Sequence, residues 1–266
     1  MKMVEAFYNL KKLPFQKNIE PKDLFMTPAA LELKNRLEHI RDIRGMMLLT
    51  GSPGVGKTLN LKAFVDQLNP NLYKFFYIPL STVTPLEFYS QICFYLTKET
   101  GWKKSQLFRT IQNGVKDYVA NHKKIPVIIL DEAHLLKNEN FQELQIITNF
   151  DMDTLDPFIV IISGQSHLSE RLMRPIHESF NQRFALKFVL PPLTKEETPD
   201  YIDHHLHIAG GKDPVFDQNA VTAIHQNAMG RPRVINTLAL NAMTIGAIEK
   251  KDLLTEEEVY RASQES

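Results

Sequence analysis

The stretch GSPGVGKT at residues 51–58 matches the pattern G-x-x-x-x-G-K-[ST] of a phosphate-binding loop. It follows the apolar run GMMLLT at 45–50, and a helical pattern continues from Lys57 to about Leu68. In such a loop, glycines let backbone N–H groups curl around phosphate oxygens, and the helix behind it points the positive end of its dipole at them. The stretch and its place between a strand and a helix therefore predict a phosphate site.

Two side chains of this loop have separate expected roles. The Lys57 ammonium is expected to reach the β- and γ-phosphates of a bound nucleotide, and the Thr58 hydroxyl to ligate Mg²⁺. The remaining contacts are expected from the backbone of the loop. The residues assigned to nucleotide binding are Gly51, Ser52, Pro53, Gly54, Val55, Gly56, Lys57, Thr58 and Leu59.

A second motif, VIILDE at 127–132, places two acids at the end of an apolar run. The carboxyl end of a strand is the edge at which open α/β sheets bind ligands. Two adjacent carboxylates there would be costly without a cation. Asp131 is expected to hold the Mg²⁺, and Glu132 is the candidate general base for an attacking water. His134, which follows the acids, is interpreted as positional rather than catalytic. Together the motifs predict a Mg²⁺-dependent nucleoside triphosphatase.

Apolar strands alternate with helices along the first 190 residues, which predicts an α/β fold with a parallel sheet covered on both faces. The predicted strands are GMMLLT, KFFYIPL, PVIILD, FIVIIS and ALKFVL. After Pro191 and Pro192, helices are expected to start at Thr194, Asp217, Pro232 and Thr255, with no strand between them. We divide the chain into an N-terminal linker and first helix (1–44), an α/β core (45–192) and a helical domain (193–266).

The charge of the chain is balanced, with 31 basic and 31 acidic residues, so any basic surface has to be local. The run 98–124 is one such region, and a solvated helical face and an anionic partner are equally consistent with it. Its basic residues are Lys98, Lys103, Lys104, Arg109, Lys116, Lys123 and Lys124, against Glu99 and Asp117.

The cysteine content and the lengths of the apolar runs indicate the cellular compartment in which the protein is expected. The single cysteine, Cys93, excludes an internal disulfide and fits a reducing cytosol. No apolar stretch approaches the ~20 residues of a membrane span, and the N-terminus lacks the features of a signal peptide. We therefore expect a soluble cytoplasmic protein without a membrane partner. His204, His205 and His207 have neither metal-ligand spacing nor a clear third ligand, so they are interpreted as part of a polar helix.

Two arginines stand at helix ends. Arg233 follows Gly230 and Pro232 in the first turn of a helix, where a cation opposes the helix dipole. A bound γ-phosphate would offset that penalty, and the alternative is a surface arginine in a salt bridge. Arg183 follows the helical sequence ESFNQ, where a cation is favourable in itself. Its functional interpretation is an arginine finger that enters a neighbouring subunit's site and implies an oligomer; Arg171 and Arg174 are weaker candidates.

Taken together, these motifs resemble the ExeA-type branch of the AAA+ ATPases over nearly the whole chain. The segments that carry the resemblance are FYNLKKLPFQ, GSPGVGKT, VIILDEAH, IISGQSHLSERL, FNQRF, PPLTKEETPDYIDHHLHIAGG and GRPRVINTLALNA. The resemblance implies a RecA-like αβα core, a C-terminal helical lid, ATP and Mg²⁺ between them, and assembly of copies into a ring or helical filament.

The same resemblance assigns further residues. Gln165, at the end of the fourth strand, matches the sensor-1 position, with Ser163 as the second choice. Arg183 matches the arginine finger, and Arg233 matches the sensor-2 arginine. The segment 13–25 is expected to pass near the adenine.

Two functional classes share this branch. In ExeA-type secretion proteins, the ATPase domain precedes a membrane segment and a peptidoglycan-binding domain. Regulators of the TnsC and TniB type assemble on duplex DNA with ATP, select or mark target DNA and recruit the transposase. Because the sequence ends at Ser266, directly after the lid, we expect the transposition regulator, with a soluble ATPase for assembly of an envelope complex as the alternative. Lys103 and Lys104 are then the expected DNA-phosphate contacts, and Trp102 either packs on DNA or anchors the turn.

Overall fold

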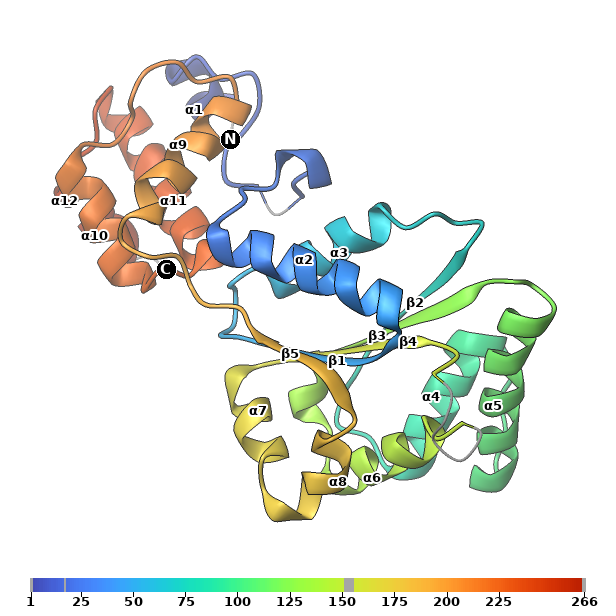
Figure 1. The fold of residues 1–266 in the computed structure, drawn as a ribbon. Coiled ribbons are helices and arrows are strands. Elements are labelled where there is room, and N and C mark those ends of the chain that lie inside the picture. Colours follow the sequence, from blue (N-terminus) through green and yellow to red (C-terminus); the bar gives the residue numbers. More distant parts are fainter. Residues whose placement is uncertain (1, 17, 151–155, 265–266) are drawn as a thin grey trace. The chain divides into compact units, whose positions relative to one another are not determined.

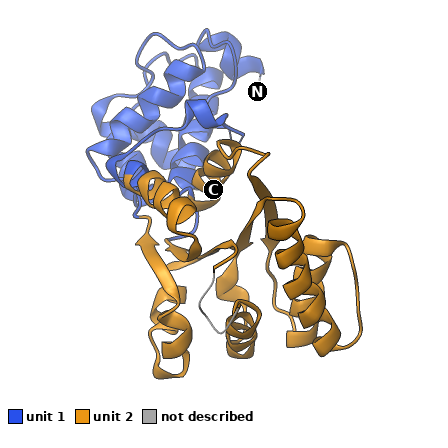
Figure 2. Cartoon of the chain, turned by 45° about the vertical axis from the view of Figure 1, so that its right-hand side comes forward, with its two compact units in different colours: residues 1–31, 52–56, 191–266 blue, residues 32–51, 57–190 orange. Residues whose placement is uncertain are grey.

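The computed structural model describes residues 2–16, 18–150 and 156–264 (Figure 1). The chain forms two compact units, shown in blue and orange in Figure 2. The helical unit contains residues 1–31, 52–56 and 191–266, and the sheet unit contains residues 32–51 and 57–190. None of the helices among the described residues has the length and hydropathy needed to cross a bilayer.

The sheet unit is built on five parallel strands in the order β2-β3-β4-β1-β5. The strands are β1 (Gly45–Thr50), β2 (Tyr73–Pro79), β3 (Ile125–Asp131), β4 (Ile159–Gly164) and β5 (Phe184–Val189). Each predicted strand is therefore present, and the predicted parallel α/β architecture is confirmed. The strands alternate with helices because every return to a parallel neighbour needs a long crossover connection.

Helices cover both faces of this sheet (Figure 1). On one face lie α2 (Pro28–Ile43) and α3 (Lys57–Asp66), and on the other α4 (Pro85–Thr97), α5 (Lys104–Ala120), α6 (Asn138–Ile147), α7 (Ser166–Leu172) and α8 (Glu178–Asn181). Along β1 the side chains alternate between the faces, so Met46 and Leu48 join the core under α4 to α8 while Met47 and Leu49 face the other way. Both faces are apolar, which explains the nearly continuous hydrophobic runs.

Strand register brings the chemical residues to one edge of the sheet. In the parallel pairing, Thr50 of β1 lies opposite Gly164 of β4, and Asp131 of β3 lies opposite Pro79 of β2. The carboxyl ends of these strands therefore meet at the same edge, next to the loop that leads from β1 into α3.

The helical unit includes the N-terminal segment. Its elements are α1 (Lys2–Phe7), the short 3₁₀ helix η1 (Pro21–Asp23), α9 (Glu197–Ile208), α10 (Gln218–Ala228), α11 (Pro232–Glu249) and α12 (Glu256–Gln264). The sequence-based division treats residues 1–44 as one segment, but residues 1–31 belong to this unit. The reason is apolar burial, since Val4, Leu13 and Phe15 share a core with the C-terminal helices.

Gly230 ends the turn before α11 in a conformation that requires glycine. Its φ is +66°, and a Cβ added there would lie 2.0 Å from the carbonyl oxygen of Leu193. The Leu193 N–H donates to the Gly230 carbonyl at 2.8 Å, so the two backbones are in direct contact. The helix break predicted from Gly230 and Pro232 is confirmed, although the residue that caps α10 is Met229, also left-handed at φ +51°.

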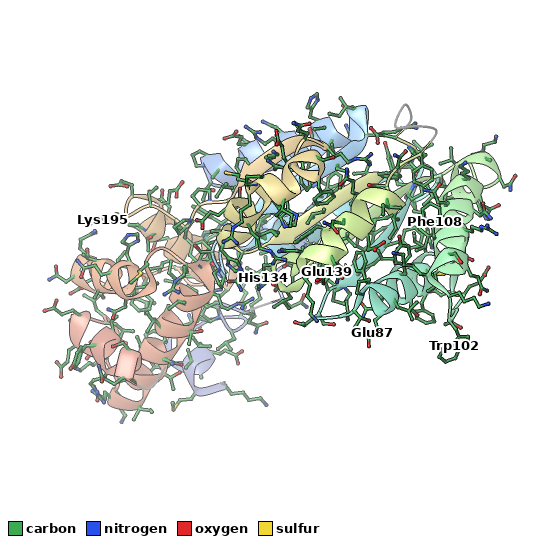
Figure 3. The ribbon with its side chains drawn as sticks, turned by 90° about the horizontal axis from the view of Figure 1, so that it is seen from below. Glu87, Trp102, Phe108, His134, Glu139 and Lys195 are labelled. Atoms are coloured by element: carbon green, nitrogen blue, oxygen red, sulfur yellow. The ribbon has the colours of Figure 1, made fainter. Side chains whose placement is uncertain are left out.

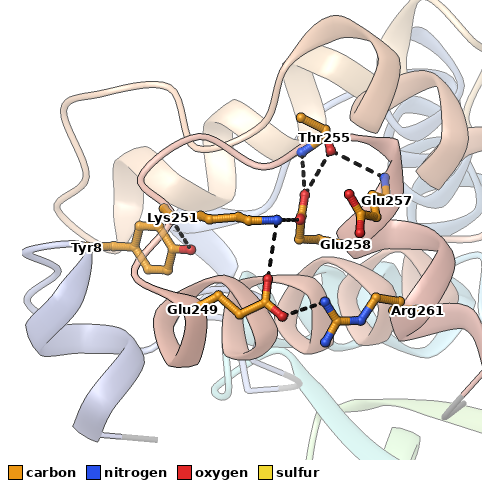
Figure 4. Close-up of polar contacts among 7 residues, drawn as sticks. All are labelled: Tyr8, Glu249, Lys251, Thr255, Glu257, Glu258 and Arg261. Atoms are coloured by element: carbon orange, nitrogen blue, oxygen red, sulfur yellow. Dashed lines mark hydrogen bonds and ion pairs between the residues drawn. The ribbon is translucent and has the colours of Figure 1, made fainter.

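A polar cluster caps α12 (Figure 4). The buried Glu258 carboxylate accepts hydrogen bonds from Lys251 Nζ at 2.5 Å and from the Thr255 N–H and hydroxyl at 2.8 and 2.9 Å. Burial raises the pKa of Glu258, but these hydrogen bonds outweigh it and lower the pKa to about 2. The predicted capping boxes at Thr84 and Thr194 are present with both bonds. At Thr255 the Glu258 half is present, while the Thr255 hydroxyl accepts from the Glu257 N–H at 3.3 Å.

His205 lies in the core of the helical unit rather than on a polar face. Its side chain is 1% exposed, stacks on the Phe15 ring at 5.2 Å and lies 4.5 Å from the Tyr201 ring. Its neighbour His204 turns to the Asp23 carbonyl at 2.7 Å. No group of three or more potential ligands within the described ranges is arranged to hold a metal ion.

The buried imidazole makes the stability of the chain depend on pH. Burial, with a smaller effect of His204, lowers the pKa of His205 from 6.5 to about 3. Below about pH 6.5, His205 is therefore protonated in the unfolded chain but stays neutral in the folded chain. Stability is lost as the pH falls from 6.5 towards 3. At one pH unit below 6.5 the loss is about 1.4 kcal/mol.

We expect His205→Phe to reduce this pH dependence while keeping the ring stack. The free energy of unfolding, measured by urea titration at pH 7.5 and 5.5, should fall less on acidification in His205→Phe than in the wild type, by about 1 kcal/mol. His207→Gln, at an exposed position of the same helix, is the control and should behave as wild type. An equal acid sensitivity of His205→Phe and wild type would contradict the assignment.

Candidate functional site

The phosphate-binding loop connects β1 to α3, as predicted. The Lys57 ammonium folds back onto the loop and donates to the Gly51 carbonyl at 2.8 Å. Gly54 and Gly56 have φ values of +81° and +100°, in the left-handed region that a side chain disfavours. The two glycines therefore permit a loop path that residues with a Cβ disfavour.

Arg233 lies beside this loop within the helical unit. Its backbone N–H donates to the Gly54 carbonyl at 3.1 Å, and a Cβ on Gly54 would approach the Arg233 Cβ to 2.9 Å. The first N–H groups of a helix lack intrahelical acceptors, so the loop carbonyl satisfies one donor of α11. The Arg233 side chain itself is exposed. Gly54 is three residues before Lys57 in the chain, so Arg233 is anchored to the loop that would carry the phosphates.

Asp131 is the centre of a hydrogen-bond network at the end of β3. It is 3% exposed, and its Oδ2 accepts from the Thr58 hydroxyl at 3.0 Å and from the Tyr77 hydroxyl at 2.9 Å. Its Oδ1 accepts from the Glu132 N–H at 3.0 Å. The structure therefore brings together Thr58 and Asp131, which were assigned to the metal. Burial, followed by the charge of Asp131, raises the pKa of Tyr77, which keeps its hydroxyl a donor.

Tyr77 was not singled out from the sequence. It lies on the edge strand β2, where register places it opposite Ile129 on β3, two residues before Asp131. Only the register of β2 against β3 places Tyr77 near Asp131. In the sequence, Tyr77 is one aromatic residue within an apolar run and is not distinguished from its neighbours.

Glu132 adopts an unusual backbone conformation, with φ +58° and ψ 31°. Its side chain is 53% exposed, and one carboxylate oxygen lies 3.3 Å from His134 Nδ1. Strained backbone of this kind clusters at functional sites. The exposure of Glu132 beside the buried Asp131 fits their different expected roles, since a general base must reach a water molecule.

The two sensor-1 candidates differ in environment. Gln165 is the N-terminal cap of α7, directly after β4, and its partly exposed side chain makes no capping hydrogen bond. Ser163 lies within β4, opposite Leu49, and its buried Oγ has no hydrogen-bond partner among the described residues. Ser163 near the end of β4 and Gln165 directly after it lie at the carboxyl end of the strand, the same end of the sheet at which Asp131 ends β3.

Arg183 is held by the C-terminal end of α6. Its guanidinium donates to the Gln145 carbonyl at 3.1 Å and to the Thr148 hydroxyl at 3.3 Å. A cation at a helix C-terminus is favourable, as its sequence position suggests, but the helix concerned is α6 rather than α8, which precedes it. To act in a neighbouring copy, Arg183 has to release these bonds.

The turn between α4 and α5 projects Trp102, which is 93% exposed (Figure 3). Lys103 caps α5 and is exposed, without a side-chain capping bond. Lys104 differs from it, because its ammonium pairs with Glu143 at 2.6 Å and lies 5.7 Å from the centre of the Tyr89 ring. Trp102 therefore does not anchor the turn by burial. Of the two expected DNA contacts, Lys104 is paired, and Lys103 has no ion pair among the described residues.

Comparison with known proteins gives one family match and one informative relative. A family model described as an AAA domain matches residues 40–172, half of the 266-residue chain. General secretion pathway protein A of Aeromonas hydrophila is 29% identical over 244 residues, which cover 91% of this chain and 44% of that protein. The chain thus spans less than half the length of this relative.

Solved structures support the fold. The structure of Cdc6p from Pyrobaculum aerophilum has a TM-score of 0.75 at 13% identity and covers 98% of this chain and 70% of its own. The ORC1 protein of Aeropyrum pernix, solved in complex with DNA, has a TM-score of 0.62 at 19% identity and covers 99% of this chain and 68% of its own. At these identities the likeness shows the fold alone, and the predicted RecA-like P-loop core with a helical lid is confirmed.

Proposed function

The chain belongs to the AAA domain family and has the fold of an AAA+ ATPase, and from that premise we propose that it is a Mg²⁺-dependent ATPase that assembles on duplex DNA and regulates transposition. The observation that carries the ATPase part is the joining of the phosphate loop to the acidic strand end, through the Thr58–Asp131 hydrogen bond. In the proposed role, nucleotide occupancy controls assembly, target marking and recruitment of the transposase and any target-selection protein.

The donor set at the strand end fits Mg²⁺. Thr58 Oγ1 and Asp131 Oδ2 are hard oxygen donors 3.0 Å apart, and a buried carboxylate is stabilised by a cation. Thr58 and Asp131 would hold the ion, which on binding would neutralise charge on the β- and γ-phosphates. Tyr77 keeps the Asp131 carboxylate in place through its own hydrogen bond.

Each residue of the site then has a separate role in ATP hydrolysis. On nucleotide binding, the Lys57 ammonium exchanges its hydrogen bond to the neutral Gly51 carbonyl for bonds to charged phosphate oxygens. Glu132 orients the attacking water and accepts its proton as the oxygen–phosphorus bond forms. Gln165, or Ser163 in its place, and Arg233 respond to the γ-phosphate, and Arg183 of a neighbouring copy stabilises charge in the transition state.

The DNA-binding part rests on the exposed turn between α4 and α5. Trp102 and Lys103 project there together, on a chain whose overall charge is balanced, so the positive surface is local. A ring or filament around duplex DNA contacts phosphates without reading bases. The DNA complex of the structurally similar Aeropyrum pernix ORC1 protein is in keeping with this use of the fold.

A second function is favoured by the sequence relative. General secretion pathway protein A matches most of this chain, so an ATPase that assists assembly of a secretion or envelope complex, without DNA, is the alternative. The two functions differ in one measurement. If the DNA role holds, duplex DNA stimulates ATP hydrolysis and promotes polymers seen by electron microscopy; if hydrolysis is unaffected by duplex and no polymer forms on it, the secretion role is favoured.

We expect the Lys103→Ala and Lys104→Ala double variant to bind duplex DNA more weakly, with a salt dependence reduced by about two units of slope if both lysines contact phosphates. If Lys104 remains paired with Glu143, the slope falls by about one unit, as in Lys103→Ala alone. Binding is measured by fluorescence anisotropy across a salt titration. Lys195→Ala, an exposed lysine of the helical unit, is the control (Figure 3). Wild-type affinity of the double variant at every salt concentration would contradict the assignment.

A further inference from the structure

His134 and Glu132 form a pair at the end of β3 that the proposed mechanism does not yet use. His134 is 9% exposed at its side chain, and its Nδ1 lies 3.3 Å from a Glu132 carboxylate oxygen. The two atoms approach without the alignment of a hydrogen bond, so Nδ1 is a buried polar atom with no hydrogen-bond partner among the described residues. Such an atom carries a desolvation cost that a small movement of the carboxylate would remove.

The backbone of His134 is fixed from two sides. The Arg171 guanidinium donates to the carbonyls of His134 (3.1 Å) and Leu136 and to the Asn138 side chain (3.1 Å). Gly164 of β4 lies against the backbone on the other side, where a Cβ would come within 3.2 Å of the His134 nitrogen. The 3₁₀ turn η2 (Ala133–Leu135) is therefore held by α7 and β4.

The imidazole ring is also held, in contrast to the Glu132 side chain. The His134 ring, labelled in Figure 3, packs edge-on against the His167 ring, with the ring centres 5.2 Å apart. Glu132 is half-exposed; its left-handed backbone donates its N–H to Asp131 and accepts at its carbonyl from the Leu135 N–H at 3.0 Å, and neither of these bonds holds the carboxylate. The buried His134 ring is therefore packed on its neighbours, whereas the Glu132 carboxylate beside it is half-exposed.

We propose that His134 is a positioning residue that donates a hydrogen bond from Nδ1 to Glu132 and holds the carboxylate towards the attacking water. The inference rests on the proposed ATPase function. In the hydrolytic step the proton of water passes to Glu132 and not to His134, which stays neutral throughout. Burial, opposed by the charge of Glu132, lowers the pKa of His134, consistent with a neutral ring that has one N–H to donate.

The test uses the two amide side chains that imitate the two ring nitrogens. The Asn amide nitrogen branches from Cγ as Nδ1 does, whereas the Gln amide lies one bond further out. We expect His134→Gln and His134→Leu to lower the kcat of ATP hydrolysis about tenfold and His134→Asn to keep it within about threefold of wild type. The Kd for Mg·ATP, measured by calorimetry, should be the same in all three, because nucleotide binding does not use Glu132.

A double-mutant cycle separates this role from simple support of the fold. In a Glu132→Gln background, His134→Gln should have no further effect on the residual rate, because the partner is gone. Additive losses, equal rates for the Asn and Gln variants, or a His134→Leu variant as fast as wild type would each overturn the inference. If the wild type itself fails to hydrolyse ATP, the proposed function fails. If the wild type hydrolyses ATP and the His134 variants do so at the same rate, the role of His134 is wrong but the proposed function stands.

Discussion

Replacing Glu132 by Gln is expected to lower the kcat for ATP hydrolysis about 100-fold or more, because general-base catalysis contributes about 10²–10⁴ to rates of this kind. The amide keeps the size of the side chain but cannot accept the proton of the attacking water. Binding of Mg·ATP should change less than about threefold, since Glu132 is 53% exposed and the phosphates are expected to be bound by the loop and by Lys57.

The measurement is a steady-state phosphate-release assay together with calorimetric titration of Mg·ATP. Glu139→Gln is the matched control, because Glu139 is an exposed acid in the first turn of α6, just beyond the acidic motif (Figure 3). Its rate should remain within about twofold of wild type. A Glu132→Gln enzyme with wild-type turnover would remove Glu132 from the mechanism.

The Glu132→Gln variant also tests whether Arg183 acts between copies. Arg183→Ala and Glu132→Gln should each be inactive alone, but a mixture forms interfaces where an intact Arg183 meets an intact Glu132. With random assembly, about a quarter of interfaces are intact, and about that fraction of wild-type activity should return. If mixed assembly is demonstrated and no activity returns at any ratio, Arg183 serves its own chain through Gln145 and Thr148.

The sequence predicts those features of the fold that depend on residues close to one another in the chain. The apolar run GMMLLT, the glycine loop after it and the cap at Thr84 each fix their own few residues of backbone, and each is present in the structure. Asp131 and Thr58 could also be predicted to meet, because parallel strands place their carboxyl ends along one edge.

The features that the sequence leaves open depend on distant contacts. Tyr77 reaches Asp131 only through the pairing register of β2 with β3. The ion pair of Lys104 with Glu143 joins residues 39 positions apart, so the basic run at 98–124 gives no sign of it. His205 looks polar in a sequence with neighbouring histidines, but Phe15 and Tyr201 bury it. Packing between segments far apart in the chain decides all three.

Nucleotide binding is expected to depend most on Lys57, whose ammonium now bonds a neutral carbonyl of its own loop. On nucleotide binding that bond is exchanged for charge-assisted bonds to phosphate, each stabilising by about 1.5–3 kcal/mol. Removing the ammonium should therefore cost about 3 kcal/mol of binding free energy, or about 100-fold in Kd. We expect the fold to survive, because the hydrogen bond to the Gly51 carbonyl is local to the loop.

Nucleotide binding through Lys57 is measured by calorimetric titration of Mg·ATP into wild type, Lys57→Ala and Lys62→Ala. Lys62 is an exposed lysine of the same helix and serves as the control. We expect saturable binding to wild type and Lys62→Ala with similar Kd, and a Kd about 100-fold weaker for Lys57→Ala. Equal affinities of all three proteins, or no binding of Mg·ATP to the folded wild type, would contradict the account.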